Sequence, residues 1–454
     1  MSLHPLRAEA GQTIKLAVPI VIGELAQMSL HIIDSAMVGG ISYKQLAAAA
    51  LVINAMNIPF VLGIGMTISV SQMVSMAHGR KSDEAVSHYL FNGFFLCGLT
   101  AIVISVFLMA GKTLLFHLGQ DPEVVRLALP FMELMGWSII PMLLFMTLKQ
   151  FADGLQFTRT AMALSLVALP VNFLLNWLLV YGNLGFPRLE LIGSGWATLI
   201  TRTIIFISLA IVILRHRNFQ PFVKLRTTQW KLKGRTLKEL LQIGIPSSLQ
   251  VGMEAGAFAV SGIMIGTIGA VAQAAHQIAL SCAAFTFMVS MGLGQAGSIR
   301  VSNAFGQGDR SRISIIGRST LIVAIAYGIF CALAFALLKD WLPFVFNKNA
   351  EVVGLASTLI LFAAVFQISD ASQAIGAGLL RGIKDVKKPT WLIAIAYWVI
   401  GLPSGYLFGF VFEMGASGIW LGFILGLSFA ALFLIIRFLR MTGRSPKLYA
   451  APIK

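Results

Sequence analysis

The stretch at 215–238, RHRNFQPFVKLRTTQWKLKGRTLK, divides the chain near its middle into two long apolar parts. It carries eight of the 34 Lys and Arg residues and is the longest polar interruption of the sequence. Of the 454 residues, 57% are hydrophobic and 11% are charged, whereas a soluble domain carries about 25% charged residues. No soluble core can bury so much apolar surface, so the composition predicts an integral membrane protein.

Apolar runs long enough to cross a bilayer lie on both sides of this segment. A helix needs roughly 20 residues to span the hydrocarbon core. We predict twelve such helices, at residues 12–39, 46–76, 87–110, 124–148, 161–182, 192–214, 239–264, 276–299, 313–338, 351–379, 391–412 and 415–437. The first run lacks a small-residue cleavage site, which indicates a retained span and not a signal peptide.

The distribution of Lys and Arg predicts the orientation in the membrane. With the N-terminus placed in the cytoplasm, 26 of the 34 lie on the cytoplasmic side, 6 on the opposite side and 2, Arg202 and Arg318, within spans. This asymmetry follows the positive-inside rule and predicts that both termini are cytoplasmic. The charges lie in short loops beside spans, so we assign the net charge of +16 to topology and contact with anionic lipid, and not to nucleic-acid binding.

An internal repeat relates the two parts of the chain. A shift of 227 positions aligns Pro19 with Pro246 and Gly39 with Gly266. Because each part holds six spans, both enter the membrane from the same side. We therefore predict an all-α integral membrane fold of twelve transmembrane helices in two six-helix lobes, related by a parallel pseudo-two-fold repeat with substrate bound between them. The expected division is an N-terminal lobe at 1–214, a basic cytoplasmic linker at 215–238, a C-terminal lobe at 239–437 and a cytoplasmic tail at 438–454.

Carboxylates within spans are the first functional candidates, because a charge at mid-membrane costs about 2.5–3.5 kcal/mol. The predicted spans contain Glu24, Asp34, Glu133, Glu254 and Asp370, and Asp153 lies near the end of a span. Small residues flank Glu254 and Asp370, so another helix can approach them closely. A buried carboxylate has to be neutralised by a proton or a cation, and hard cations prefer oxygen ligands. We expect Glu254, Asp370 and Asp34 to take part in cation coupling; the alternative is a carboxyl group hydrogen-bonded within the bundle.

Amide side chains form a second set of candidates. Asn172 and Asn176 are four residues apart and share one helix face. We expect them to bind substrate or Asp34 in a polar cavity, or else to join helices by hydrogen bonds. Gln27 is a further cavity candidate, and the 227-residue shift aligns it with Glu254. The two halves thus keep their acids at different depths, which favours the C-terminal half as the ion site.

No catalytic constellation is visible in the sequence. It contains no GxSxG, Walker A or HExxH motif, and the GLGQAG at 292–297 lies in a span without the βαβ context of a nucleotide site. The three cysteines lack zinc or redox spacing. We therefore expect neither an enzyme nor an organic cofactor, and no metal beyond a monovalent cation at Glu254 and Asp370. The coupling ion would be Na⁺ or H⁺.

Four stretches resemble the multidrug and toxic compound extrusion (MATE) family, in its NorM-like branch. They are PIVIGELAQMSLHIIDSAMVGG at 19–40, PVNFLLNWLLVYGNLG at 170–185, AAHQIAL with MGLGQAGSIRVSNAFG at 274–306, and GLLRGIKDVKKP at 378–389. The resemblance implies a V-shaped pair of six-helix bundles that exports hydrophobic organic cations in exchange for Na⁺ or H⁺. It also implies that Asp34 is the first-helix acid of the N-terminal lobe, and that Glu254 and Asp370 are the acids linked to coupling.

The resemblance also shows a departure and leaves two questions open. Branches with a fully acidic N-lobe cation site carry an acid on the fifth helix, whereas this sequence has Asn172 and Asn176 there, which weakens a cation site around Asp34. The residues do not separate Na⁺ from H⁺, although the NorM-like pattern favours Na⁺. A lipid-linked-precursor flippase is the alternative function, but only Arg202 and Arg318 are available within spans to bind phosphate. We expect the protein to act as a monomer.

Overall fold

The computed structural model describes residues 3–117, 121–223 and 230–443. These residues form helices and turns, and none of them belongs to a β-strand. Twelve of their helices are long and apolar enough to cross a membrane, and each overlaps one of the predicted spans. The hydrophobic runs therefore predicted the number and order of the spans correctly, and the protein is an all-helical multi-pass membrane protein.

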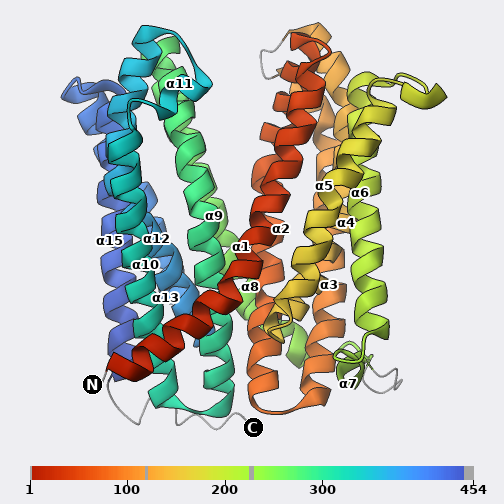
Figure 1. Cartoon of the computed structure of the whole chain (residues 1–454), viewed down its shortest axis with the longest axis vertical. Helices are drawn as coiled ribbons and strands as arrows, with labels where there is room; N and C mark the ends of the chain where they lie inside the picture. The colour runs from red at the N-terminus through yellow and green to blue at the C-terminus, as the bar shows by residue number, and fades with distance from the viewer. Residues whose placement is uncertain (1–2, 118–120, 224–229, 444–454) are drawn as a thin grey trace. The chain divides into compact units, whose positions relative to one another are not determined.

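The elements follow one another in a simple order (Figure 1). The first part of the chain contains α1 (Leu3–Gly39), α2 (Tyr43–Gly79), α3 (Asp83–Gly111), η1 (Lys112–His117), α4 (Pro122–Gly154), α5 (Thr158–Leu179), η2 (Asn183–Gly185), α6 (Glu190–Arg215) and α7 (Gln220–Val223). The second part contains α8 (Gly234–Ile268), α9 (Ala270–Gln307), α10 (Arg310–Leu338), α11 (Leu342–Phe346), α12 (Ala350–Gly382), α13 (Lys387–Ala394), η3 (Ile395–Gly401), α14 (Leu402–Tyr406), η4 (Leu407–Val411) and α15 (Gly415–Gly443).

Polar caps mark where several spans begin. Ser42 accepts a hydrogen bond from the backbone N–H of Gln45 at the start of α2, and Ser82 does the same for Ala85 in α3. Such caps satisfy backbone donors that the first helical turn leaves unpaired. α9 ends at Gly308, whose φ of +74° lies in the left-handed region that glycine adopts without strain. Short turns of this kind make successive helices antiparallel neighbours.

The eleventh span differs from the others around Pro403. Pro59, Pro141 and Pro170 lie within continuous helices, whereas Pro403 lies in α14 between two π-helical segments, η3 and η4. Wide π-turns frequently occur at functional sites. This span also packs closely on α15: a Cβ added at Gly422 would lie 2.4 Å from the backbone nitrogen of Gly405. The glycines therefore allow the two backbones to touch.

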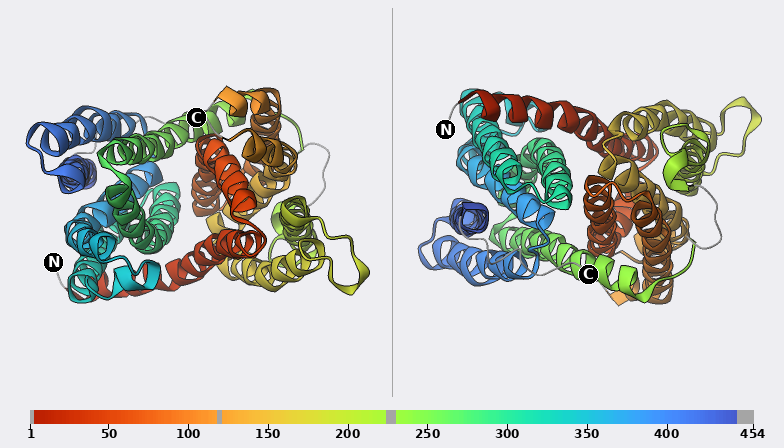
Figure 2. Two further views of the ribbon diagram at one scale, coloured as in Figure 1. Left: turned by 90° about the horizontal axis from the view of Figure 1, so that it is seen from above. Right: turned by 90° about the horizontal axis from the view of Figure 1, so that it is seen from below.

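The chain divides into two compact units whose boundaries fall inside helices. The N-unit is residues 22–248, and the C-unit is residues 1–21 together with 249–454. α1 and α8 each belong partly to both units. The shift of 227 residues that aligns Pro19 with Pro246 also aligns Val21 with Ser248, the last residue before each change of unit. Viewed along the helices, each unit is a bundle (Figure 2).

Specific contacts hold these exchanged helix ends. In the C-unit, Arg300 of α9 donates to the backbone oxygen of Glu9 and to the hydroxyl of Thr13, each at 2.6 Å, and to the Gln12 amide oxygen at 2.8 Å. In the N-unit, the Ser248 hydroxyl donates to the backbone oxygen of Leu62 at 2.7 Å. Each of these contacts lies within one unit.

The expected linker and tail lie only partly within the described residues. Of the linker, Arg215 ends α6, residues 220–223 form α7 and residues 234–238 begin α8; residues 224–229 lie outside the described part of the chain. Of the tail, residues 438–443 continue α15, and residues 444–454 are likewise outside the described part.

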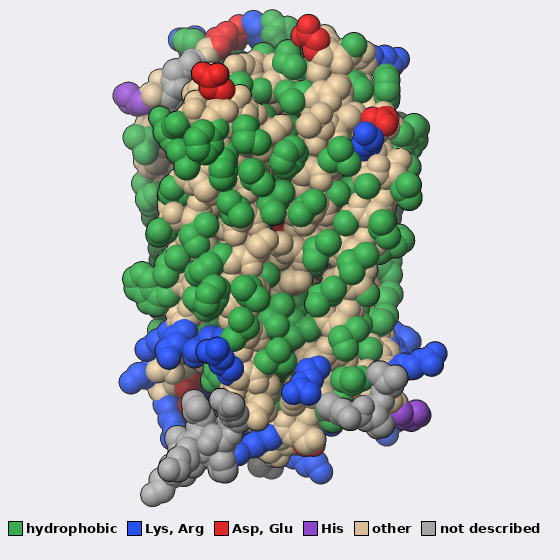
Figure 3. Space-filling model, turned by 90° about the vertical axis from the view of Figure 1, so that its left-hand side faces the viewer, with side chains coloured by type: hydrophobic (Ala, Val, Ile, Leu, Met, Phe, Trp, Pro, Cys, Tyr) green, Lys and Arg blue, Asp and Glu red, His purple; other side chains and the backbone are tan. Residues whose placement is uncertain are grey.

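Hydrophobic side chains and basic side chains separate along the helices. Figure 3 shows a face of the C-unit on which hydrophobic side chains cover the broad middle band. Lys and Arg gather at the lower end of this face, while Asp and Glu appear mainly at the upper end. A lipid-facing apolar band bounded by a basic end is the pattern that the positive-inside rule predicts.

Candidate functional site

Two acids of the C-unit lie near each other although 116 positions separate them in the sequence. Glu254 is on α8 and Asp370 is on α12, and the two carboxyl groups interact electrostatically. Asp370 is 1% exposed, and its Oδ2 atom is buried without a hydrogen-bond partner in the described part of the chain. A buried carboxylate oxygen without a donor has lost its hydration and gained nothing in exchange, which is costly unless a proton or cation is present.

Other polar groups surround these acids. Tyr397, presented by the π-helical segment η3, is 1% exposed and lies close enough to interact with both Glu254 and Asp370. Gln367 precedes Asp370 by one helical turn, is fully buried, and has an amide oxygen without a partner among the described residues. Arg381, near the end of α12, interacts electrostatically with Glu254. The cluster thus offers carboxylate, phenol and amide oxygens, the ligands that hard cations prefer.

An aromatic layer holds the two acid-bearing helices together. Phe258 follows Glu254 by one turn on α8, and Phe366 precedes Asp370 by one turn on α12. Their ring centroids lie 6.2 Å apart, and the ring of Phe258 is also 6.2 Å from that of Tyr397. Because residues four apart share a helix face, this contact turns both carboxyl groups toward the same region.

Asp34 in the N-unit has a different environment. Both of its carboxylate oxygens accept hydrogen bonds: Asn176 donates to Oδ1 at 2.8 Å, and Thr198 donates to Oδ2 at 2.9 Å. Asn176 also donates to Asn172 one turn earlier on α5. The predicted contact between the asparagine pair and Asp34 is therefore present, through Asn176. Amide and hydroxyl donors stabilise the carboxylate but supply no countercharge.

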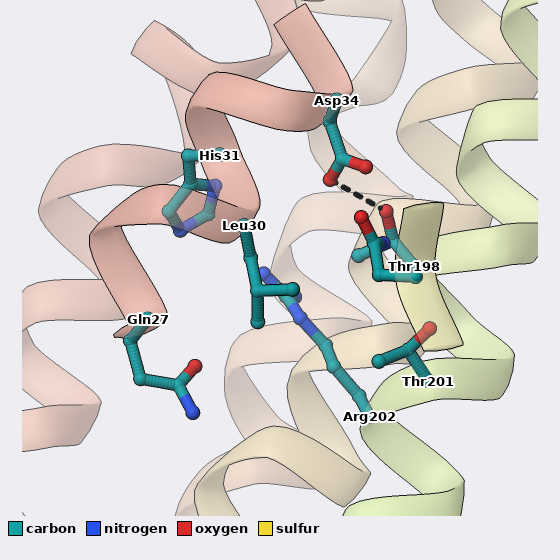
Figure 4. Close-up of a pocket in the computed structure, with 8 residues that line it drawn as sticks. Gln27, Leu30, His31, Asp34, Thr198, Thr201 and Arg202 are labelled. Atoms are coloured by element: carbon teal, nitrogen blue, oxygen red, sulfur yellow. Dashed lines mark hydrogen bonds between the residues drawn. The ribbon is translucent and has the colours of Figure 1, made fainter. Parts of the chain in front are cut away.

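A pocket opens beside Asp34 (Figure 4). It is lined by Gln27, Leu30, His31, Asp34, Asn172, Thr198, Thr201 and Arg202. In Figure 4 the Asp34 carboxylate points to Thr198, while the guanidinium of Arg202 extends from the opposite side toward Leu30 and His31. The predicted cavity residues Gln27 and Asn172 thus lie in one pocket with Asp34, and a basic side chain shares it.

The two remaining groups of acids within the predicted spans are paired with lysines. Lys149, which the sequence count placed among the cytoplasmic loop charges, is instead 2% exposed within α4. It contacts Glu24 at 2.9 Å and Asp153 at 3.2 Å. Glu133 pairs with the half-exposed Lys112. The assignment of Lys149 to a loop was wrong because the helix continues to Gly154, six residues beyond the predicted end of the span.

Sequence reasoning missed three residues that the fold brings to these sites: Thr198, Tyr397 and Arg381. Thr198 is 164 positions from Asp34, and Tyr397 is on a different helix from Glu254 and Asp370, with which it interacts electrostatically. Hydroxyl groups within spans are too common to be marked by pattern alone. A tyrosine in the predicted span that also contains Pro403 was the one available signal for Tyr397.

Comparisons with known proteins agree with this arrangement. A model of the MatE family matches the chain twice, over residues 19–178 and 246–407. The two matches begin at Pro19 and Pro246, the pair that the 227-residue shift aligns. The match covers well over half of the chain and falls on both of its halves.

Individual relatives extend over nearly the whole chain. The chain is 32% identical over 440 residues, 96% of both chains, to the multidrug resistance protein NorM of Photobacterium profundum. Its fold is similar to that of the eukaryotic MATE transporter AtDTX14, with a TM-score of 0.87 and 19% identity over 96% of this chain and 99% of the other. A multidrug resistance MATE transporter of the MOP superfamily gives a TM-score of 0.87 and 18% identity over 97% and 98%. The chain therefore belongs to the MATE family, and it is a transporter and not an enzyme.

Proposed function

We propose that the protein exports hydrophobic organic cations and drugs in exchange for Na⁺ or H⁺, and that Glu254 and Asp370 bind the coupling cation. The family and the similarity to a protein named for multidrug resistance support export of drugs. The observation that carries the coupling site is the fully buried Asp370, whose carboxylate has an oxygen without a donor beside a second acid.

The charges of the C-unit cluster favour a monovalent cation. Glu254 and Asp370 together carry two negative charges when ionised, and Arg381 near Glu254 offsets one of them. The remaining charge matches one proton or one Na⁺. Because an uncompensated carboxylate within a membrane costs about 2.5–3.5 kcal/mol, loss of the cation favours a different conformation. A cation that binds one facing of the transporter better than the other shifts the equilibrium between them, which is the basis of alternating access.

Asp34 has a secondary role in this proposal. Its two donors, Asn176 and Thr198, stabilise the ionised carboxylate, and neither adds a second negative charge. A site with one acid binds a cation more weakly than a site with two. We assign Asp34 to a weak cation site at the substrate pocket, with Gln27, Asn172 and Asn176 as its polar lining.

The charge pattern supports the location. We place the protein in a bacterial inner membrane with its termini in the cytoplasm, because Lys and Arg gather at one end of the apolar band (Figure 3). Anionic lipid is the expected partner of this basic end. The protein is expected to act as a monomer.

Transport in vesicles tests the coupling site. The purified protein is placed in lipid vesicles, a fluorescent organic cation is supplied, and Na⁺ and pH gradients are imposed separately. We expect Glu254→Gln and Asp370→Asn each to abolish the response to the driving gradient. Glu351→Gln is the matched control, because Glu351 is exposed in the first turn of the same helix as Asp370.

The outcomes separate the site from the function. Gradient-driven exchange that is unchanged in both acid variants contradicts the assignment of Glu254 and Asp370. Failure of the wild-type protein to move any organic cation under either gradient contradicts the proposed function itself. A response to only one of the two gradients identifies the coupling ion.

A further inference from the structure

α1 and α8 each pass from one compact unit to the other inside a continuous helix. Val21 is the last residue of α1 in the C-unit, and Ser248 is the last residue of α8 in the N-unit. In the described part of the chain, the backbone passes between the units only at these two points. Any rotation of one unit relative to the other therefore has to be taken up by these two helices.

Contacts on both sides of its change of unit hold α1 in place. Before this point, Arg300 donates to the Thr13 hydroxyl at 2.6 Å, within the C-unit. After it, Lys149 contacts Glu24 at 2.9 Å, within the N-unit, and Glu24 is only three positions beyond Val21. Because three positions are less than one helical turn, α1 is fixed to the N-unit almost as soon as it leaves the C-unit.

α8 is held in a similar way. The Ser248 hydroxyl donates to the backbone oxygen of Leu62 at 2.7 Å, within the N-unit. Two positions later, Gln250 donates to the Thr390 hydroxyl at 2.9 Å, within the C-unit. The part of α8 that can bend or turn between the two units is therefore about one helical turn around Ser248.

A glycine contacts the exchanged helix at each of these points. In the N-unit, a Cβ added at Gly65 of α2 would lie 2.4 Å from the Cα and 2.6 Å from the backbone nitrogen of Ser248. In the C-unit, a Cβ added at Gly292 of α9 would lie 2.4 Å from the Cγ2 atom and 3.2 Å from the backbone nitrogen of Val21. The two glycines thus let the helix backbones approach more closely than any other residue would allow.

The internal repeat relates these two contacts. Gly65 and Gly292 are 227 positions apart, and so are Val21 and Ser248. Gly292 is also the first residue of the GLGQAG stretch, and its position explains why this stretch begins with glycine. The last glycine of the stretch, Gly297, contacts α10 within the C-unit instead, where an added Cβ would lie 2.7 Å from the Cγ2 atom of Thr320.

We propose that Gly65 and Gly292 are paired pivots: α8 turns on Gly65, and α1 turns on Gly292, when one unit rotates relative to the other. Interdigitated side chains resist such rotation, because packed interfaces do not deform continuously. A contact made by glycine has no side chain to interlock, so the two backbones can turn against each other. This inference rests on the proposed function, since alternating access requires two facings of the transporter.

A clash at Gly292 that a second substitution removes tests the proposal. Gly292→Ala places a Cβ against the Cγ2 atom of Val21, and we expect it to slow gradient-driven export of a fluorescent organic cation from vesicles at least about tenfold. Val21→Ala removes Cγ2, so the double variant should recover most of the export, and Val21→Ala alone should export like the wild type. Gly297→Ala is the matched control, because its clash lies between two helices that stay within the C-unit.

Spin labels report the motion independently of transport. One label replaces Arg126 of the N-unit and the other replaces Lys348 of the C-unit, both of which are exposed, after the three buried native cysteines have been changed to alanine. Distances between the labels are measured by double electron–electron resonance with and without Na⁺ and at acidic and alkaline pH. We expect the distance distribution of the wild type to change with the coupling ion. Gly292→Ala should lose this change, and the double variant with Val21→Ala should regain it.

The clash at Gly65 should resist rescue. Its added Cβ would meet backbone atoms of Ser248, which no side-chain substitution removes. Gly65→Ala should therefore impair export at least as much as Gly292→Ala does, and Ser248→Ala should not restore it.

The possible results are distinct. Equal export and label response in Gly292→Ala and Gly297→Ala would overturn the proposal, and so would a double variant as impaired as Gly292→Ala. A loss of export in Gly292→Ala that accompanies a melting temperature below that of Gly297→Ala shows a packing role only and also overturns it, as do wild-type label distances that respond to neither ion. A wild-type protein whose label distances respond but that exports no organic cation contradicts the proposed function, whereas the label distances still decide the role of Gly292.

Discussion

Removal of the ammonium group of Lys149 should destabilise the N-unit severely. Lys149 is 2% exposed and contacts Glu24 at 2.9 Å and Asp153 at 3.2 Å, and the side chains of these acids are 10% and 1% exposed. Lys149→Met preserves most of the side-chain volume but leaves two buried carboxylates without a countercharge. Breaking a buried ion pair in this way costs about 3–5 kcal/mol.

The expected shift in melting temperature follows from the size of the unit. A domain of about 150–250 residues loses roughly 2–4 °C for each kcal/mol, and the N-unit spans residues 22–248. We therefore expect the apparent melting temperature of Lys149→Met to fall by about 6–20 °C. The assay is thermal unfolding of the purified protein in detergent, followed by intrinsic fluorescence and by the monodisperse fraction on size-exclusion chromatography.

Two further variants make the result interpretable. Lys112→Met is the matched control, because the Lys112 and Glu133 side chains are 38% and 47% exposed, and exposed pairs contribute only about 0–1 kcal/mol. The triple variant Glu24→Gln, Lys149→Met, Asp153→Asn removes the buried charges together and should regain most of the lost stability. A melting temperature of Lys149→Met that matches the Lys112→Met control would refute the reasoning, and so would a triple variant as unstable as the single one.

Three other predictions test packing and the Asp34 pocket. Gly422→Ala should destabilise the protein by about 1–3 kcal/mol, because the new Cβ would lie 2.4 Å from a backbone nitrogen. Gly354→Ala is the control and should be neutral or stabilising, because a Cβ there meets nothing within 4 Å. Equal melting temperatures of the two variants would contradict this prediction. Asn176→Asp should make drug export depend more steeply on the concentration of the driving cation, because the new carboxylate and that of Asp34 would lie within hydrogen-bond distance and need a shared proton or cation. The same dependence of export on cation concentration in the variant and the wild type would exclude this effect. Thr198→Val should weaken binding of organic cations about several-fold, because the Asp34 carboxylate loses one of its two donors and is harder to keep ionised; unchanged dye anisotropy would count against it.

The spans and their order could be predicted because hydropathy is a local property. Each of the twelve predicted runs overlaps one long helix. The internal repeat was also visible, since equivalent residues keep their order at a nearly constant shift, and Pro19 and Pro246 begin the two family matches. The ends of helices were less predictable: α4 continues to Gly154 and buries Lys149, which hydropathy alone assigned to a loop.

The site could be predicted only as a set of residue types. Burial of a charge in lipid is so costly that Asp34, Glu254 and Asp370 stand out in any apolar run. Their partners do not, because Thr198 and Tyr397 are ordinary residues until another helix packs beside them. The side chains that bond to Asp34 come from helices more than 140 positions away.

The sequence by itself determined that this chain spans a membrane twelve times, which parts of it repeat, and which acids require compensation. These features follow from transfer energies that each residue or short run carries alone. Only the tertiary structure decided what surrounds each acid: amide and hydroxyl donors for Asp34, a lysine for Glu24 and Asp153, and a second acid beside Asp370, whose Oδ2 has no donor among the described residues. It also decided that α1 and α8 pass from one compact unit to the other at equivalent positions. Such pairings depend on contacts between helices distant in the chain, which no local pattern encodes.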